Sequence, residues 1–459
     1  MKQYQNYKDS GSRWINLIPS HWLCYRLRFV CDLRNGYTPS KAEESFWKDG
    51  TIPWFRMDDI RENGRFLAKS KQYITQEAVK GNGLFEAGSF ILATTATIGE
   101  HALLIVDSLA NQRFTNLKIR KSLEPGVSRN FLFYYLFIID EYCKTTTKKT
   151  TFPAVNIDDL KNFPVCLPPL AEQKAIAEYL DEKCGKIDGM IEQIDKKIAL
   201  YERLRRAIIA KTVTKGLDPN VPLRPSGIEW IGEIPMHWDV KRFGYLAWIR
   251  ARLGWKGLKA DEYVESGYPF LSAFNIVNDK MNWESLNYIN QFRFEESPEI
   301  MLHPGDILLV KDGAGIGKCA RVDSLPKGES TTNGSLAVIT PFEAVNYKYL
   351  HYFIISDSFN QYKDILINGM GVPHLTQGEM KKMYLPVPPI KEQEEIAEYL
   401  DKRCHVIEEN IANYVKQKEL LERYRKALIA QVVTGKRRVC EPSFIYPDVT
   451  SDSPAMAAE

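Results

Sequence analysis

Hydrophobic residues recur with a heptad spacing in two long segments of the chain, residues 168–216 and 388–436. Apolar or aromatic residues alternate there at spacings of four and three over about four heptads, and most positions between them are polar. This spacing is typical of the seam of a coiled coil. Each segment begins with a Pro-Pro pair, which suits the approach to a helix but not its interior. The pattern predicts two long helices, each with an apolar stripe that needs a partner. The other helix is the nearest candidate.

The predicted interface of this helix pair consists of the seam positions of both segments. They are Leu180, Cys184, Ile187, Ile191, Ile194, Ile198, Tyr201, Leu400, Cys404, Ile407, Ile411, Tyr414 and Leu421. About 40 residues at 1.5 Å each make a helix of roughly 60 Å. Cys184 and Cys404 occupy equivalent positions, where we expect two buried thiols and no bridge.

The second segment repeats the first at an offset of 220, with 19 of 40 residues identical between 171–210 and 391–430. The opening of the chain has a twin as well, because a Trp-Ile-x-x-Ile-Pro-x-His-Trp string begins at Trp14 and again at Trp230. This period is far longer than that of solenoid repeats and indicates a duplicated half-protein. Trp22 and Trp238 close the two strings. We interpret them as anchors between each domain and the helices, rather than as base-stacking groups.

The sequence between the repeated opening strings and the two long helices predicts globular domains of mixed α/β (α+β) class. Residues 88–94 and 305–311 are typical of strands entered from turns, residues 131–142 of a buried helix, and short helical turns are expected from Asn156 and Thr376. Residues 29–80 and 247–299 share little text, as expected of two modules that hold different ligands on one frame. The predicted domains are 1–167 and 217–387, with helices at 168–216 and 388–436 and a frayed tail at 437–459.

Composition does not indicate a function, but it argues against several classes of protein. A net charge of +3 is nearly balanced, so any basic face must come from local placement. The sequence shows no apolar run long enough to cross a bilayer and no signal peptide, which predicts a cytoplasmic protein. Eight scattered cysteines without a Cys-x-x-Cys pair argue against a metal site and for a reducing compartment.

No catalytic or cofactor-binding motif emerges. Residues 312–318 lack the first glycine and the final Ser or Thr of a Walker loop, and they also fail the dinucleotide fingerprint at Lys318. We interpret this segment as a turn between strands, from which Lys318 could reach a DNA phosphate. There is no Asn/Asp-Pro-Pro-aromatic tetrad, nucleophile elbow or zinc-protease motif. The sequence therefore predicts a protein that is not an enzyme and that holds no cofactor or metal of its own.

Basic residues in the divergent regions are the remaining candidates for DNA contacts, because Arg and Lys bind phosphates and read guanine edges. They are Arg56, Arg61, Arg65, Arg113, Lys148, Lys149, Arg250, Arg252, Lys256, Lys311 and Lys318.

The repeated opening string and the Pro-Pro-Leu-x-Glu-Gln-x-x-Ile-Ala-x-Tyr-Leu-Asp text resemble the specificity subunit of type I restriction-modification systems, over about residues 12–436. The resemblance implies two target-recognition domains separated by an antiparallel helix pair with a pseudo-twofold axis. It implies that each domain reads one half of a split DNA site, and that the helices fix the gap between the halves. The expected partners are double-stranded DNA, two N6-adenine methyltransferase subunits and ATP-driven translocase-nuclease subunits. S-adenosylmethionine, ATP and Mg²⁺ are expected on those subunits.

Two other interpretations stay open at the level of sequence. One is a coiled-coil adaptor whose modules bind proteins and not DNA, which the balanced charge allows. The other is a free-standing enzyme with an unfamiliar site. Salt-dependent DNA binding separates the first from a specificity subunit, since phosphate contacts release counterions. Methyl transfer by the purified chain alone would support the second.

Overall fold

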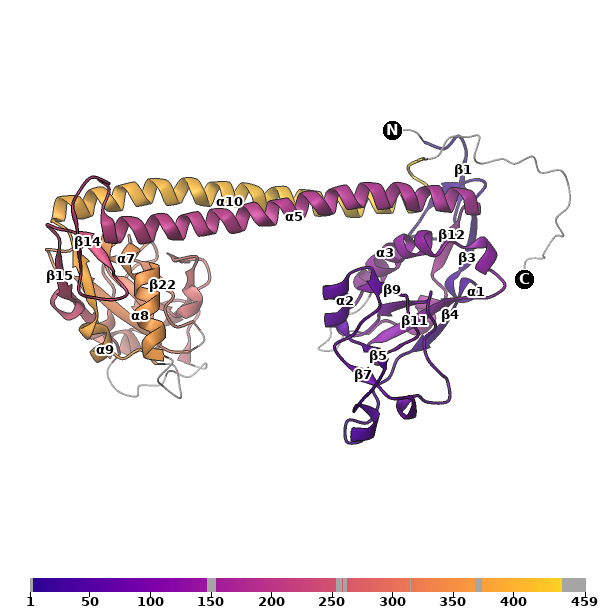
Figure 1. Cartoon of the computed structure of the whole chain (residues 1–459), viewed down its shortest axis with the longest axis horizontal. Helices are drawn as coiled ribbons and strands as arrows, with labels where there is room; N and C mark the ends of the chain where they lie inside the picture. Colours follow the sequence, from indigo (N-terminus) through magenta and orange to yellow (C-terminus); the bar gives the residue numbers. More distant parts are fainter. Residues whose placement is uncertain are drawn as a thin grey trace. The chain divides into compact units, whose positions relative to one another are not determined.

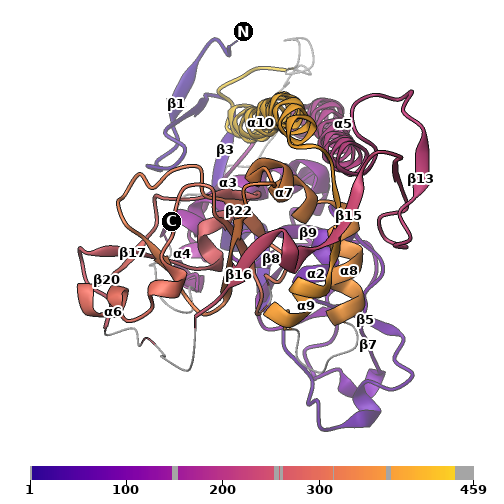
Figure 2. The same cartoon turned by 90° about the vertical axis from the view of Figure 1, so that its left-hand side faces the viewer.

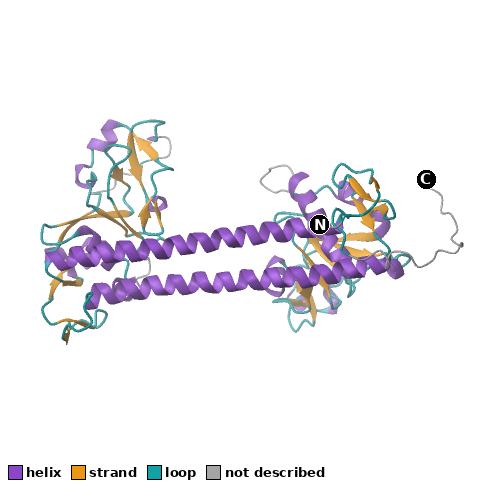
Figure 3. Cartoon of the chain, turned by 90° about the horizontal axis from the view of Figure 1, so that it is seen from above, coloured by secondary structure: helices purple, strands orange, loops and turns teal. Residues whose placement is uncertain are grey.

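The computed structural model describes residues 3–146, 154–252, 258, 262–313, 315–367 and 374–439. The two heptad segments form α5 (Leu170–Lys215) and α10 (Ile390–Val433), unbroken helices of 46 and 44 residues (Figure 3). The chain divides into two compact units, residues 1–193 with 416–459 (unit 1) and residues 194–415 (unit 2). Each unit therefore contains one globular domain, one part of α5 and one part of α10.

The domain of unit 1 (domain 1) is built on a five-stranded sheet of order β4-β11-β8-β9-β6, in which only β6 and β9 are parallel. A smaller sheet of order β10-β5-β7 covers one face. Its elements are β1 (Tyr7–Asp9), β2 (Leu17–Pro19), β3 (Leu23–Arg26), α1 (Leu27–Val30), β4 (Cys31–Asn35), β5 (Ile52–Phe55), α2 (Met57–Asn63), β6 (Phe66–Leu67), β7 (Tyr73–Ile74), β8 (Phe90–Ala93), β9 (His101–Leu104), β10 (Leu109–Ala110), β11 (Phe114–Ile119), α3 (Arg129–Thr146), α4 (Ile157–Lys161) and β12 (Pro164–Leu167).

Alternation along β8 explains the two layers of domain 1. Phe90 and Leu92 belong to a buried cluster with α3 and the two long helices, whereas Ile91 and Ala93 belong to a second cluster with the smaller sheet. Successive strand residues point to opposite faces, so a strand that is apolar throughout is buried on both. Figure 1 shows α3 between the sheet and α5. The predicted helix over 131–142 is confirmed, although it extends to Thr146.

The domain of unit 2 (domain 2) repeats this plan, with sheets of order β16-β24-β21-β22 and β20-β17-β23. Figure 2 shows α7 between α10 and the larger sheet. The elements are β13 (Leu223–Pro225), β14 (Glu233–Pro235), β15 (Asp239–Arg242), β16 (Ala247–Arg250), β17 (Tyr268–Leu271), β18 (Ile276–Val277), β19 (Lys280–Met281), β20 (Asn287–Ile289), α6 (Gln291–Glu295), β21 (Ile307–Val310), β22 (Cys319–Arg321), β23 (Thr331–Thr332), β24 (Leu336–Pro341), α7 (Tyr347–Ile354), α8 (Asp357–Ile367), α9 (Gln377–Lys382) and β25 (Tyr384–Val387).

The two middles that share little text share their strand pairing. In each smaller sheet the central strand, β5 or β17, pairs parallel with one neighbour and antiparallel with the other. The two middles therefore combine one backbone frame with different side chains. One similarity in sequence is a Pro-aromatic pair, Pro53-Trp54 and Pro269-Phe270, at the same offset of 216 as the opening string.

The helix parts run antiparallel within each unit. In unit 2 the rings of Tyr201 and Tyr414 lie 5.8 Å apart, and farther along α5 the Arg205 Nε lies 3.7 Å from Oε1 of Glu408. In unit 1, Arg425 Nε lies 2.9 Å from Oδ1 of Asp188. The predicted seam positions are buried at Leu180, Cys184, Ile187, Ile194, Leu400, Cys404 and Ile407, and half-buried at Ile191, Ile198, Tyr201, Ile411, Tyr414 and Leu421.

Three polar residues at the start of α5 fasten domain 1 to the helix. Glu172, fully buried, accepts hydrogen bonds from Tyr4 (2.6 Å) and from Trp22 Nε1 (3.3 Å). Gln173 accepts from the backbone N–H of Ser128 (2.8 Å) and donates to the carbonyls of residues 126 and 168. Asp181 accepts from Tyr134 (2.6 Å). The residues that attach domain 1 to α5 therefore belong to the sequence that is repeated in α10.

Domain 2 is fastened to α10 through the matching residues. Glu392 accepts from Trp238 Nε1 (3.0 Å), and Gln393 accepts from the backbone N–H of Asn346 (2.8 Å). Asp401 accepts from Tyr352 (2.7 Å) and from Arg321 Nη1 (2.8 Å). Trp22 and Trp238 are 0% and 1% exposed, so the interpretation of both as anchors is confirmed and base stacking by them is excluded in this state.

Substituting His351 should alter the pH dependence of stability. His351 precedes Tyr352 and is buried. Burial, with Arg321 and Arg205 nearby, lowers its pKa to about 3. Since the unfolded residue titrates near 6.5, the unfolded chain gains a proton that the folded domain excludes, and stability falls as pH drops from about 6.5 toward 3. We expect His351→Phe, which copies Phe133 of domain 1, to remove a penalty of about 2 kcal/mol at pH 5.

The check is denaturant unfolding of the full chain at pH 7 and pH 5. His405→Phe is the matched control, because the His405 side chain is 68% exposed on α10. Equal pH slopes for His351→Phe and the unsubstituted chain would contradict the assignment.

A glycine in left-handed conformation follows each long helix and packs on an anchor tryptophan. A Cβ on Gly435 (φ +73°) would lie 2.3 Å from Pro19 Cδ and 3.4 Å from the Trp22 ring. A Cβ on Gly216 (φ +75°) would lie 3.2 Å from the Trp238 ring. The end of one helix and the start of the other therefore meet at the same tryptophan in each unit.

Gly435→Ala should destabilise unit 1 by about 2 kcal/mol or more, since it adds a steric clash to the strain of a positive φ. Gly11→Ala is the matched control, because Gly11 has φ +74° with nothing within 4 Å of its Cβ. We expect the control to cost about 1 kcal/mol, from backbone strain alone. Thermal unfolding of the full chain measures both, and equal losses would show that the packing on Pro19 contributes nothing.

Two cysteines are paired, which the prediction of a reducing compartment did not anticipate. Cys24 of β3 and Cys166 of β12 lie directly opposite each other in an antiparallel pair and form a disulfide. A separation of 142 residues gave no signal in the sequence. Cys184 and Cys404 are buried free thiols, as predicted. None of the described helices is both long and apolar enough to span a membrane.

Candidate functional site

Several loops of domain 1 meet where strands of its two sheets end. Asn111, just after β10, donates its backbone N–H to the carbonyl of Phe55 at the end of β5 (3.1 Å). Thr94, just after β8, donates to the carbonyl of Arg113 (2.9 Å) and accepts from the backbone N–H of Val155 (2.9 Å). Four segments thus come together at one edge, residues 36–38, 94–99, 111–113 and 154–156 with Arg56 beside them. We call this the loop edge of domain 1.

Domain 2 has the same edge, held by the same backbone bonds. Asn333 donates to the carbonyl of Leu271 (2.8 Å), Lys311 donates to that of Ser335 (2.9 Å), and Leu375 donates to that of Lys311 (2.9 Å). Its loop edge comprises residues 311–313, 315–318, 333–335 and 374–376. The turn predicted at residues 312–318 is confirmed for its described residues, 312–313 and 315–318, which lie between β21 and β22.

The side chains on the two edges differ although the frame is shared. Thr95 of domain 1 bridges to Ala154, whereas the matching residue of domain 2, Asp312, bridges to His374. Arg113 is exposed where domain 2 has Ser335. Because the three named backbone bonds of each edge match, these side chains differ on one shared frame.

Some of the predicted basic residues lie on or beside these edges. Arg113 and Lys318 are exposed there. Lys311 pairs with Asp312, and Arg56 Nη2 lies 3.8 Å from Asp58. Arg252, two residues after β16, has a side chain only 8% exposed and contacts Glu296 (3.3 Å). Lys148, Lys149 and Lys256 lie outside the described residues.

Three predicted residues have other partners. Arg65 bonds Asp181 and lies over the ring of Phe133, which makes it part of the contact between domain and helix. Arg61 pairs with Glu100 (3.1 Å). Arg250 is 5% exposed and donates to Asp306 (3.0 Å), so we leave it out of the proposed DNA-contacting set.

Thr95, Asp312 and His374 were not among the predicted residues, because none belongs to a motif. The sequence did contain a signal for the loop edges themselves, in the paired Asn-x-(Arg/Ser) strings at 111–113 and 333–335. Each asparagine side chain accepts from the backbone N–H two residues on, at 2.9 Å in domain 1 and 3.1 Å in domain 2. These short turns fix the register of the two edges.

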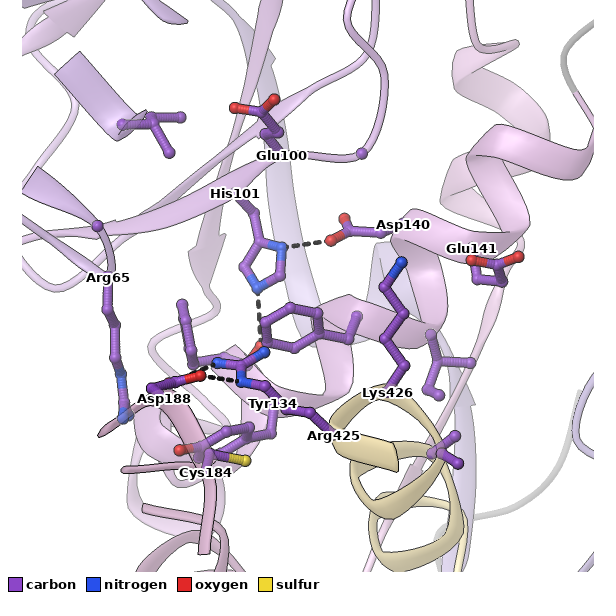
Figure 4. A pocket seen from close by; sticks show the side chains of 18 of the residues that line it. Arg65, Glu100, His101, Tyr134, Asp140, Glu141, Cys184, Asp188, Arg425 and Lys426 are labelled. Atoms are coloured by element: carbon purple, nitrogen blue, oxygen red, sulfur yellow. Dashed lines mark hydrogen bonds and ion pairs between the residues drawn. The ribbon is translucent and has the colours of Figure 1, made fainter. Parts of the chain in front are cut away.

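A pocket of about 850 Å³ lies in unit 1 between domain 1 and the helix parts (Figure 4). Its buried His101 places Nδ1 2.6 Å from Asp140 Oδ2 and Nε2 3.0 Å from the carbonyl of Phe133. Burial raises the pKa of Asp140. Both ring nitrogens face fixed oxygen atoms, so His101 has no nitrogen left to act as a general base. The pair ties β9 to α3. Among the described residues no group of three or more His, Cys, Asp or Glu could hold a metal ion.

The sequence matches the family model for the type I restriction modification DNA specificity domain twice, over residues 19–199 and 235–417. The chain belongs to this family. It is 33% identical over 404 residues to the type I restriction enzyme EcoprrI specificity subunit of Escherichia coli, with 84% of this chain and 88% of that protein covered. It is 28% identical over 436 residues to the MjaIX specificity subunit of Methanocaldococcus jannaschii, covering 93% and 96%.

A solved structure concerned with complex assembly and conformational transition of the type I R-M system matches with a TM-score of 0.66. It covers 91% of this chain and 98% of its own at 18% identity, which shows a shared fold. The chain is thus a specificity subunit, whose family role is recognition of a DNA sequence, and it is not catalytic. Each of the two family matches includes one of the two loop edges.

Proposed function

We propose that this specificity subunit reads a bipartite, asymmetric site in double-stranded DNA, one half through each loop edge. Residues 1–167 and 217–387 would be the two reading domains. The observation that carries the proposal is that both edges have one backbone frame and different side chains. Equal frames present their side chains to the duplex in the same way, and unlike side chains prefer unlike bases.

The chemistry of the edges supports contact with DNA. Arg113 and Lys318 are exposed cations suited to phosphates or guanine edges. Thr95 and His374 add hydroxyl and imidazole groups, which donate to or accept from base edges in the major groove. Such a mixture fits sequence recognition better than a uniform cationic surface, which binds without preference.

In this proposal the subunit directs N6-adenine methylation and restriction that partner subunits carry out. Two methyltransferase subunits and the translocase-nuclease subunits bind it in the assembled complex. S-adenosylmethionine, ATP and Mg²⁺ serve those partners, and the complex works in the cytoplasm, where the DNA is.

A map of modified adenines in cells that carry or lack this chain tests the proposal. We expect a motif of two unlike halves separated by a fixed number of unspecified bases, present only when the chain is present. A protein-binding adaptor would leave the map unchanged, and this chain alone would then show no salt-dependent binding to DNA. A continuous or symmetric motif would contradict the assignment of one half-site to each domain.

A further inference from the structure

Domain 2 holds a histidine on its loop edge in a fixed orientation. His374 Nδ1 bonds Oδ1 of Asp312, and the backbones of these two residues form an isolated antiparallel bridge. The second carboxylate oxygen, Oδ2, bonds Nζ of Lys311. Lys311 is in turn held by its backbone bonds to Ser335 and Leu375. The imidazole is therefore positioned by the Asp312 carboxylate, which Lys311, the residue after β21, holds in turn.

This arrangement leaves the far side of the imidazole open. The His374 side chain is 44% exposed, while those of Asp312 and Lys311 are 34% and 13% exposed. Within the part of the chain that the structure describes, no hydrogen bond is made by Nε2 of His374. A ring whose Nδ1 is fixed on a carboxylate can turn little, so its Nε2 is presented at one place on the edge.

Domain 1 shows what the same frame looks like without this device. The residues that match Lys311, Asp312 and His374 are Thr94, Thr95 and Ala154. There the Thr94 hydroxyl forms a buried hydrogen bond with that of Thr115 (2.9 Å) and does not position a side chain on the edge. The orienting arrangement is therefore a property of domain 2 alone and not of the shared scaffold.

We infer that His374, positioned by Asp312, is a specificity-determining residue that contacts one base edge in the half-site read by domain 2. When the ring carries its proton on Nδ1, toward the carboxylate, Nε2 accepts a hydrogen bond, which suits the exocyclic amino group of adenine or cytosine in the major groove. Asp312 is a positioning residue in this inference. The inference rests on the proposed function and adds to it the residue and the class of base.

The test uses the assembled methyltransferase complex and duplexes in which each position of the half-site is changed in turn. We expect His374→Ala to lose about ten- to a hundredfold of the discrimination at one position and to leave the other half of the site unaffected. Asp312→Asn, which keeps the volume and removes the charge, should relax the same position by a smaller factor. Lys318→Ala is the matched control from the same edge, and it should weaken binding to all duplexes alike.

The outcomes separate the inference from the proposed function. If His374→Ala leaves discrimination unchanged at every position while the two-part motif persists, the inference is wrong and the proposed function stands. A uniform loss like that of Lys318→Ala would also overturn it, because His374 would then contact only the DNA backbone. If the unsubstituted complex shows no two-part motif, the proposed function itself fails.

Discussion

Exchanging residues 27–163 for the first reading domain of another family member will change one half of the methylated sequence completely and leave the other half intact. The exchange point keeps the pairing of β3 with β12, so the replaced domain starts and ends on the same two strands. The incoming domain meets Glu172, Gln173 and Asp181 unchanged. Because a base-reading contact discriminates by about 1–3 kcal/mol and a half-site holds several, the preference should switch by orders of magnitude.

Genome-wide mapping of modified adenines measures this result. The reciprocal exchange of residues 243–383, which keeps the pairing of β15 with β25, is the matched control and should change only the other half. Both halves changing in either exchange, or neither changing, would show that the halves are not read independently.

Lengthening both long helices by four residues each should lengthen the unspecified spacer and preserve both half-sites. Four residues add about 6 Å of helix, which corresponds to between one and two base pairs at about 3.4 Å each. The insertions belong between Leu200 and Tyr201 and between Tyr414 and Val415, because the Tyr201–Tyr414 contact then stays within unit 2. Sites near the helix ends are unsuitable, since Val213 and Val432 are fully buried there.

An unchanged spacer with full activity would show that the helices do not set the separation of the half-sites. The control is the same insertion in α5 alone. It should cost stability and activity, because the two seams would no longer match in length.

The helices were predictable from sequence for a physical reason. A seam residue such as Leu180 needs only periodicity to be recognised, and the burial of the seam follows from the pattern. The anchor role of Trp22 could be inferred because its string recurs with fixed spacing. Its partner could not, since Glu172 lies 150 residues away and only the fold brings the two together.

The candidate DNA-contacting residues were less predictable, because charge alone does not distinguish a base-contacting side chain from one that forms an ion pair within the protein. Arg250 and Arg113 look alike in sequence, yet one is buried against Asp306 and the other is exposed on the loop edge. The common topology of the two middles was also hidden. Strand pairing is made by backbone groups, and many side-chain patterns satisfy it.

Unit 1 is completed by residues from opposite ends of the sequence. The Tyr7 hydroxyl donates to the carbonyl of Gly435, 428 positions later, and Leu428 lies in the same core as Trp22. On the ribosome, domain 1 therefore emerges long before the last turns of α10 that finish its core, whereas unit 2 is a single continuous stretch. A premature stop within those turns would leave apolar core residues of domain 1 exposed to solvent. Cellular quality control should therefore act on domain 1, the domain that is synthesised first.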